Sequence, residues 1–243
     1  MPARLQAFFM LLLLLVGCAP RAAESGAVLL VPGGRIVGAW AELDGGFPLP
    51  APPLFADRRG DRLYLAYPFE LDVFEHGELS AVFDLPGVPR FLHARPGLAL
   101  GTDAGLFTED AGLLPYPAKD ARFFRGQVYW LDPKGHPYRD ETPLSQERFR
   151  AVVADQERLA FLGPEAWLPG GSRFALPEYR KGELYEDLYL LTDAAVLRYS
   201  LSGLRLGERR GRYRDLAVDA GGVWLLDAEN RLVRLDHDLE ERP

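Results

Sequence analysis

The fold is decided by the stretch Leu216-Ala217-Val218-Asp219-Ala220-Gly221-Gly222-Val223-Trp224-Leu225-Leu226-Asp227, which continues after a short gap as Arg231-Leu232-Val233-Arg234-Leu235-Asp236. Its apolar segments are short and rich in Leu, Val and Trp, which favours strands over helices. Asp, Gly and Asn separate these segments, and such residues reverse the chain. The stretch therefore predicts three consecutive antiparallel strands.

The same pattern recurs along the chain. Seven short apolar runs align with one another: Val28-Leu29-Leu30-Val31, Leu63-Tyr64-Leu65-Ala66, Leu98-Ala99-Leu100-Gly101, Val128-Tyr129-Trp130-Leu131, Leu159-Ala160-Phe161-Leu162, Leu188-Tyr189-Leu190-Leu191 and Val223-Trp224-Leu225-Leu226. Between their second residues the steps are 35, 35, 30, 31, 29 and 35 residues. Most runs follow an apolar pair: Leu54-Phe55, Phe91-Leu92, Phe123-Phe124, Val152-Val153 and Leu216-Ala217. A period of about 33 residues indicates a repeat architecture.

Three strands in about 33 residues, with room for a fourth, predict one small blade of a β-propeller. The predicted fold is therefore all-β, a β-propeller of six or seven short blades, and the seven runs favour seven. Residues Leu216–Asp236 resemble an NHL-type propeller repeat, and Leu98–Phe107 resembles the propeller repeats in sensor regions of bacterial two-component regulators. These resemblances imply a fold and no single activity. A β-sandwich is the rival fold, but it would not require so regular a period.

Three segments need separate interpretation. Residues 145–160 can be read as a helix, but Leu159 to Leu162 fall on the period, so we favour strands there. The prolines in Phe47–Pro53 exclude a central strand and predict a linker between the first two units. A closed ring requires its ends to meet, so we expect Val28–Val31 to pair in the sheet next to Arg231–Leu235.

The N-terminus predicts export. Arg4 is the only charge before an apolar run, Phe8–Val16, that is too short to span a bilayer and has the length of a signal peptide. The run ends in Leu15-Val16-Gly17-Cys18, which resembles the lipobox of bacterial lipoproteins. That resemblance implies cleavage before Cys18 and its modification with acyl chains such as palmitate. The alternative is an ordinary secretory signal with a cysteine there by chance.

These observations divide the chain into a signal peptide (1–17), a lipidated tether (18–26) and the propeller domain (27–243). We expect a protein of the bacterial cell envelope, anchored to a membrane by lipid and facing the periplasm or the exterior. Two or three acyl chains give stable anchoring, because each buried CH₂ contributes about 0.8 kcal/mol.

Composition narrows the classes of partner. Of 243 residues, 48% are hydrophobic, enough for a real core, and the net charge of −7 argues against nucleic acid and anionic lipid headgroups. The single cysteine excludes an internal disulfide and a cysteine-cluster zinc site. We expect a monomer that folds without a metal or cofactor, because its strands supply sufficient apolar area.

Four aspartates are the candidate site residues, because each comes just after the first strand of a predicted hairpin. They are Asp103, Asp132, Asp193 and Asp227. Aspartate caps turns by accepting hydrogen bonds from amides two residues on, and we favour this role. The alternative is a partial ring of carboxylates that binds a ligand or Ca²⁺ on the face where propellers often bind ligands.

Other polar and aromatic patterns have structural interpretations. We assign the aromatic residues Tyr64, Tyr129, Tyr189 and Trp224 to the core, because their strands are apolar on both faces. The basic run 208–214 is expected to be a solvated connection between blades, with an anion or acidic-partner contact as the alternative. The four histidines have no metal-ligand spacing, and the motifs of nucleophilic hydrolases, phosphate-binding loops and zinc proteases are absent.

Two functional hypotheses follow. We favour a non-catalytic binding or scaffold module for an envelope protein or a small ligand. The alternative is a propeller hydrolase, similar to lactonases, with Glu, Asp and Asn ligands around a central divalent metal. Asn230 is the only asparagine, which counts against the hydrolase.

Overall fold

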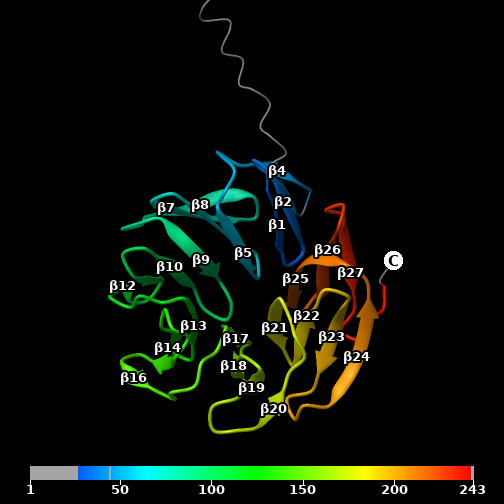
Figure 1. The fold of residues 1–243 in the computed structure, drawn as a ribbon. Helices are drawn as coiled ribbons and strands as arrows, with labels where there is room; N and C mark the ends of the chain where they lie inside the picture. The colour runs from blue at the N-terminus through cyan, green and yellow to red at the C-terminus, as the bar shows by residue number, and fades with distance from the viewer. Residues whose placement is uncertain (1–26, 44, 242–243) are drawn as a thin grey trace, which may run out of the picture.

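The computed structural model describes residues 27–43 and 45–241, and these residues form a ring of seven antiparallel sheets around a central axis (Figure 1). They contain strands and turns only, so the helix considered for 145–160 does not form. No helix in the described ranges is long and apolar enough to cross a membrane. The seven-bladed β-propeller is confirmed, whereas the predicted signal peptide and the whole predicted tether, Cys18 included, lie outside the described residues.

The first four blades cover residues 28–143. Blade 1 consists of β1 (Val28–Val31), β2 (Gly34–Val37), β3 (Trp40–Glu42) and β4 (Phe47–Pro48). Blade 2 consists of β5 (Phe55–Arg59), β6 (Arg62–Tyr67), β7 (Glu70–Glu75) and β8 (Glu78–Asp84). Blade 3 consists of β9 (Pro89–His93), β10 (Ala99–Thr102), β11 (Leu106–Thr108) and β12 (Gly112–Leu114). Blade 4 consists of β13 (Asp120–Phe124), β14 (Gln127–Leu131), β15 (Pro137–Arg139) and β16 (Thr142–Pro143).

The last three blades cover residues 151–235. Blade 5 consists of β17 (Ala151–Ala154), β18 (Leu159–Leu162), β19 (Glu165–Trp167) and β20 (Arg173–Ala175). Blade 6 consists of β21 (Lys181–Tyr185), β22 (Asp187–Leu191), β23 (Ala195–Tyr199) and β24 (Arg205–Arg210). Blade 7 has three strands, β25 (Tyr213–Asp219), β26 (Gly222–Asp227) and β27 (Leu232–Leu235). The basic run 208–214 therefore lies partly in β24, the outer strand of blade 6.

The first strand of each blade lies next to the axis, and the later strands follow outward in sequence order (Figure 1). Contacts between neighbouring blades join β1, β5, β9, β13, β17, β21 and β25 into a closed inner ring. This arrangement corrects one alignment made from the sequence. Six of the seven apolar runs lie in second strands, but Val28–Val31 forms the inner strand β1. An apolar run alone therefore does not tell an inner strand from a second strand, and the position of the strand within its blade is also needed.

Seven apolar clusters hold the ring together, one between each pair of neighbouring blades. In blades 2 to 7 the second strands contribute to both adjacent clusters, which explains why they are apolar on both faces. Tyr64, Tyr189 and Trp224 are buried in these clusters and Tyr129 is partly buried, so the assignment of this aromatic column to the core is confirmed. Each large side chain contributes about 1.5–3 kcal/mol on full burial.

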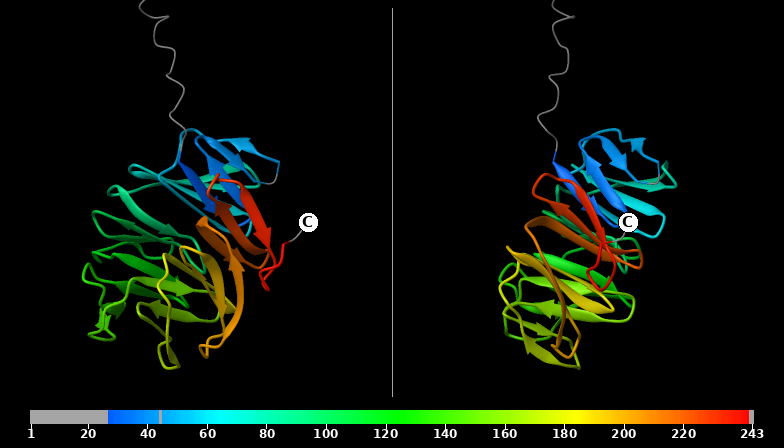
Figure 2. Two further views of the ribbon diagram at one scale, coloured as in Figure 1. Left: turned by 45° about the vertical axis from the view of Figure 1, so that its right-hand side comes forward. Right: turned by 90° about the vertical axis from the view of Figure 1, so that its right-hand side faces the viewer.

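Blades 7 and 1 close the ring through side-chain packing. Among the described residues, no strand of either blade pairs in the sheet of the other. β1 is hydrogen-bonded to β2 of its own blade, and it packs against β25 and β26. Leu30 contacts Ala217, Trp224 and Leu226 in the smallest of the seven clusters. The Arg35 guanidinium also donates to the Asn230 carbonyl across this seam. Figure 2 shows the two coloured ends of the chain, blue and red, side by side at this closure.

Candidate functional site: the central cavity

A cavity of about 450 Å³ lies on the axis of the ring and is lined mainly by the inner strands of all seven blades. Alternate residues of a strand face the same side of a sheet, so every second residue of each inner strand faces the axis. In β21, for example, these residues are Lys181 and Glu183, whereas Leu184 is buried between blades. A cavity of this size fits a small organic molecule.

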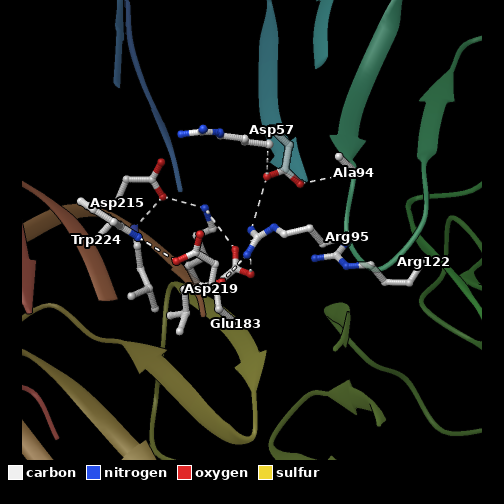
Figure 3. Close-up of polar contacts among 12 residues, drawn as sticks. Asp57, Ala94, Arg95, Arg122, Glu183, Asp215, Asp219 and Trp224 are labelled. Atoms are coloured by element: carbon white, nitrogen blue, oxygen red, sulfur yellow. Dashed lines mark hydrogen bonds and ion pairs between the residues drawn. The ribbon is translucent and has the colours of Figure 1, made fainter. Parts of the chain in front are cut away.

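One end of the cavity is closed by Arg95, which follows β9 of blade 3 and crosses the axis (Figure 3). Its Nη2 lies 3.3 Å from Oδ1 of Asp57 in blade 2 and 3.6 Å from Oε2 of Glu183 in blade 6. Its Nη1 donates to the carbonyl of Val218 in blade 7. A single side chain thus connects three other blades across the axis.

Asp57 is the most completely hydrogen-bonded carboxylate at this closed end. Its Oδ2 accepts the amide of Ala94 at 2.8 Å, and its Oδ1 accepts the amide of Arg58 at 2.8 Å (Figure 3). Burial acts to raise the pKa of Asp57, but the charge of Arg95 and these amides outweigh it and hold the pKa below its ordinary value. Asp57 is therefore an ionised, fully partnered structural carboxylate.

Lys181 is the ion-pair partner of two further carboxylates of the cavity. Its Nζ lies 2.8 Å from Oδ1 of Asp215 in blade 7 and 3.5 Å from Oε1 of Glu183. Burial acts to lower the pKa of Lys181, but the neighbouring carboxylates raise it above its ordinary value. The amine therefore stays charged and serves as an ion-pair partner.

The opposite wall holds a second group, formed by Asp120, His93 and Arg122. Nε2 of His93 lies 2.8 Å from Oδ1 of Asp120, whose Oδ2 accepts the amide of Val152 at 2.7 Å. Arg122 is buried, yet its nearest carboxylate oxygen, Oδ1 of Asp120, is 3.6 Å away. Burial and the charge of Arg122 lower the pKa of His93, so the imidazole is neutral near pH 7 and donates to Asp120.

The other end of the cavity is an open mouth, where the inner strands begin. Arg150 and Arg180 line it, and both are exposed. Nε of Arg180 lies 3.1 Å from Oδ1 of Asp193, whereas Arg150 makes no side-chain hydrogen bond or ion pair with any described residue. The hydroxyl of Tyr179, also in the cavity wall, is buried and has no partner among the described residues. An unsatisfied buried hydroxyl costs about 1–3 kcal/mol.

The basic residues at the mouth belong to a repeat that extends over five consecutive blades. Lys119, Arg150 and Arg180 each precede an inner strand, and their amides donate to the equivalent carbonyls of Leu131, Leu162 and Leu191. In blades 3 and 7 the equivalent residues are Arg90 and Arg214, which precede the inward-facing Phe91 and Asp215. The complete set is Arg90, Lys119, Arg150, Arg180 and Arg214. All five are exposed. We call this set the basic ring.

Two of the four predicted aspartates are turn caps. Oδ1 of Asp132 accepts the amides of Lys134 and His136 at 2.9 and 2.8 Å. Oδ1 of Asp227 accepts the amides of Glu229 and Arg231 at 2.9 and 2.8 Å. These are the side-chain-to-backbone bonds expected of aspartate in a turn.

Asp103 and Asp193 are one residue beyond that position, so the four aspartates are not equivalent. The register places Thr102 and Thr192 where the other blades have Asp132 and Asp227. The two threonine hydroxyls accept the turn amides instead. Asp103 accepts the amide of Val88 at 2.9 Å, and Asp193 is the ion-pair partner of Arg180. An alignment of the four aspartates by residue type alone does not show this one-residue difference in register.

None of these four aspartates lines the central cavity. In the described part of the chain, no group of three or more His, Cys, Asp or Glu side chains is placed to hold a metal ion. The residues that do meet in the cavity were not singled out from the sequence. Their signal was the alternation of charged and apolar residues in the inner strands, as in Lys181-Gly182-Glu183-Leu184.

Comparison with known proteins supports the fold. No protein-family model matches the sequence, and no curated protein matches it significantly. Among solved structures, the chain is similar to the BBS1N chain of a BBS1N–ARL6DN complex, with a TM-score of 0.63, 14% identity and coverage of 91% of this chain and 96% of that one. The chain is also similar to PorZ of Porphyromonas gingivalis, a surface component of the type-IX secretion system. The TM-score is 0.63 and the sequence identity is 12%, with coverage of 90% of this chain and 38% of the PorZ chain. Similarity to Kluyveromyces lactis Hsv2 has a TM-score of 0.57 and 9% sequence identity, with coverage of 88% of this chain and 94% of the Hsv2 chain.

Proposed function

We propose that this protein is a lipid-anchored binding module of the bacterial cell envelope. The propeller is a non-catalytic scaffold for a protein partner or a small ligand, and Cys18 attaches it to a membrane. It faces the periplasm or the exterior and acts as a monomer. The anchor is proposed from the lipobox-like Leu15-Val16-Gly17-Cys18, which lies outside the described residues.

The proposal of a binding role rests on the hydrogen bonds and ion pairs that occupy the four carboxylates of the cavity. Asp57 is held by Arg95 and two amides, and Asp120 by His93 and an amide. Glu183 and Asp215 are paired with Lys181. A general base or a metal ligand needs a carboxylate that can approach a substrate or an ion. These four are occupied in joining blades, which is a structural role.

The propeller fold is compatible with protein binding. The BBS1N chain, whose fold this chain shares, was solved in complex with ARL6DN. At 14% identity this likeness concerns the fold alone, and it supports the proposal only by showing that such a ring can present a binding surface.

Fractionation of cells that express the full chain tests the anchor. Cys18→Ser should move the protein from the membrane fraction to the soluble fraction, because the thiol is the only possible acylation site. Cys18→Ala is the matched variant and should behave in the same way. Membrane retention of both variants equal to that of the wild type, after cleavage of the signal peptide, would contradict lipidation.

Crosslinking in the native envelope, followed by identification of the captured proteins, tests the partner. One reproducible partner that is lost on dissociating washes supports a scaffold. The competing assay is metal analysis of the purified chain together with a lactone-hydrolysis screen. A stoichiometric divalent metal with measurable turnover would replace the binding module with a propeller hydrolase.

A further inference from the structure

The cavity has two chemically different walls. Leu29, Phe55 and Phe91, near the start of the inner strands of blades 1 to 3, form an apolar wall at the mouth, and Phe91 stacks on His93 with ring centroids 5.5 Å apart. The polar residues of blades 2 and 3, Asp57, His93 and Arg95, line the cavity farther along these strands and, for Arg95, just after β9. The wall formed by blades 4 to 6 carries Arg122, Arg150 and Tyr179. A ligand that fills this space therefore meets apolar surface on one side and hydrogen-bond donors on the other.

Of the cations that line the cavity, Arg150 alone has no side-chain partner among the described residues, since Arg180 is paired with Asp193 at the mouth. The cations are Arg95, Arg122, Arg150, Arg180 and Lys181, and the carboxylates are Asp57, Asp120, Glu183 and Asp215. Every one of these carboxylates has a cationic, imidazole or amide partner, as described above. Arg150 has no side-chain partner among the described residues, and Arg122 has the 3.6 Å ion pair with Asp120 and a 3.2 Å hydrogen bond to the Ala121 carbonyl. The unused hydrogen-bonding capacity is thus that of donors.

A second, independent observation is the unpartnered hydroxyl of Tyr179. The residue is 6% exposed, it lines the cavity, and the charge of Arg150 acts on it. Buried hydroxyls are normally hydrogen-bonded, so this one has unused hydrogen-bonding capacity in a residue of the cavity wall. A guanidinium and a hydroxyl in one wall form a common binding arrangement for a carboxylate.

We propose that the central cavity binds a small organic monocarboxylate with an apolar body, with its carboxylate at Arg150 and Tyr179 and its apolar part against Leu29, Phe55 and Phe91. A single negative charge matches Arg150, the one lining cation without a described partner, and this disfavours dianions such as phosphate monoesters. The volume of about 450 Å³ fits a molecule the size of an N-acylated amino acid. This inference deepens the proposed binding role and rests on it.

The basic ring has a different part in this proposal. Arg90, Lys119 and Arg214 do not line the cavity, so they do not contact its ligand. Around a mouth, exposed cations raise the local concentration of anions and hence the association rate. Arg90 therefore provides a matched control for Arg150: both are exposed arginines at equivalent repeat positions, and only Arg150 lines the site.

Titration calorimetry on the full chain in detergent tests the proposal with N-acetylphenylalanine as the probe. We expect binding of the carboxylate and about tenfold weaker binding of the neutral N-acetylphenylalaninamide, because the amide leaves Arg150 without a counter-ion. N-acetylglycine should bind more weakly than N-acetylphenylalanine, because it lacks the apolar body. Equal binding of acid and amide, preferential binding of the cation phenethylamine, or no binding of the acid at millimolar concentration would overturn the proposal.

Variants locate the binding to the named residues. Tyr179→Phe and Arg150→Gln should each weaken binding of the acid about fivefold to tenfold, mainly through faster dissociation. Arg90→Gln should change the affinity less than about twofold. Thermal melts verify that Tyr179→Phe, which keeps the ring, remains folded. Equal losses for Arg90→Gln and Arg150→Gln would show a general charge effect and no carboxylate site. Protein crosslinking in the envelope does not depend on this result, so failure here leaves the scaffold role separately testable.

Discussion

The two ends of the central cavity use the same residue types for different purposes. At the closed end, Arg95 is 21% exposed and contacts Asp57, Glu183 and the backbone of blade 7. At the open mouth, Arg150 is exposed and has no partner among the described residues. Both are arginines next to an inner strand.

The difference shows how position along the axis determines the role of a charge. A charge taken out of water must be paired, because the desolvation penalty of an unpaired ion is several kcal/mol, of the order of 5. Closing the ring brings Asp57 and Glu183 to opposite sides of Arg95 and supplies that pairing. At the mouth, water solvates the guanidinium, so Arg150 needs no protein partner and is free for a ligand. Stability should therefore depend on the closed end, and binding on the mouth.

Removing the closing arginine should produce the largest effect. Arg95→Met keeps much of the side-chain volume but leaves Asp57 and Glu183 without this cation, and we expect a loss of about 3–5 kcal/mol in the free energy of unfolding. Urea denaturation monitored by tryptophan fluorescence measures it. A loss below about 1 kcal/mol would show that the contacts of Arg95 across the axis do not stabilise the ring.

A smaller loss is expected from the carboxylate on the other side of this ion pair. Asp57→Asn keeps the shape but removes the charge, and should cost about 1–3 kcal/mol at pH 7. The pKa of Asp57 is below its ordinary value because Arg95 and the amides outweigh burial, so its contribution is present above about pH 4 and is lost as the pH falls through the lowered pKa. Denaturation from pH 7 to pH 3 should therefore show the difference between wild type and variant decreasing in acid. A constant difference would contradict this assignment.

His93 should impose a pH dependence in a different range. Burial and Arg122 lower its pKa, so the unfolded chain takes up a proton near pH 6.5 that the folded chain does not. Stability should therefore fall as the pH drops below about 6.5. His93→Gln retains a donor for Asp120 and should reduce this slope between pH 7 and 5. An unchanged slope in that interval would mean that folding does not lower the pKa of His93.

The smallest effect on stability is expected at the mouth. Arg150→Gln removes an exposed charge without a described partner, and the free energy of unfolding should change by less than about 0.5 kcal/mol. The same denaturation assay provides the direct comparison with Arg95→Met. A loss of more than about 1 kcal/mol would remove the distinction between the two ends.

Much of the fold could be predicted from the sequence, because the second strands of blades 2 to 7 are buried on both faces and form continuous apolar runs in the sequence. Phe161 and Leu225, for example, are fully buried between blades. The inner strands gave only apolar pairs such as Val152-Val153, since their alternate residues face a polar cavity. The inner strand β1 is an exception, because it is apolar along its whole length and therefore resembles a second strand in the sequence.

The candidate site could not be predicted in the same way. Arg95, Glu183 and Val218 are far apart in the sequence, and only the closure of seven blades brings them together. The turn caps Asp132 and Asp227 were predictable because their bonds are local, within four residues. Local hydrogen bonding can thus be inferred from short patterns, whereas pairing across the axis depends on the curvature of the whole ring.

The place where β1 begins has a consequence for the distance between the cavity and the membrane. Val28 starts this innermost strand at the end of the ring where the mouth opens, and ten positions separate it from Cys18. An extended chain advances at most about 3.3–3.6 Å per residue. With the proposed anchor at Cys18, the mouth therefore stays within about 35 Å of the lipid surface. Carboxylates released from the bilayer or its headgroup layer would reach Arg150 over a path comparable to the thickness of the membrane itself.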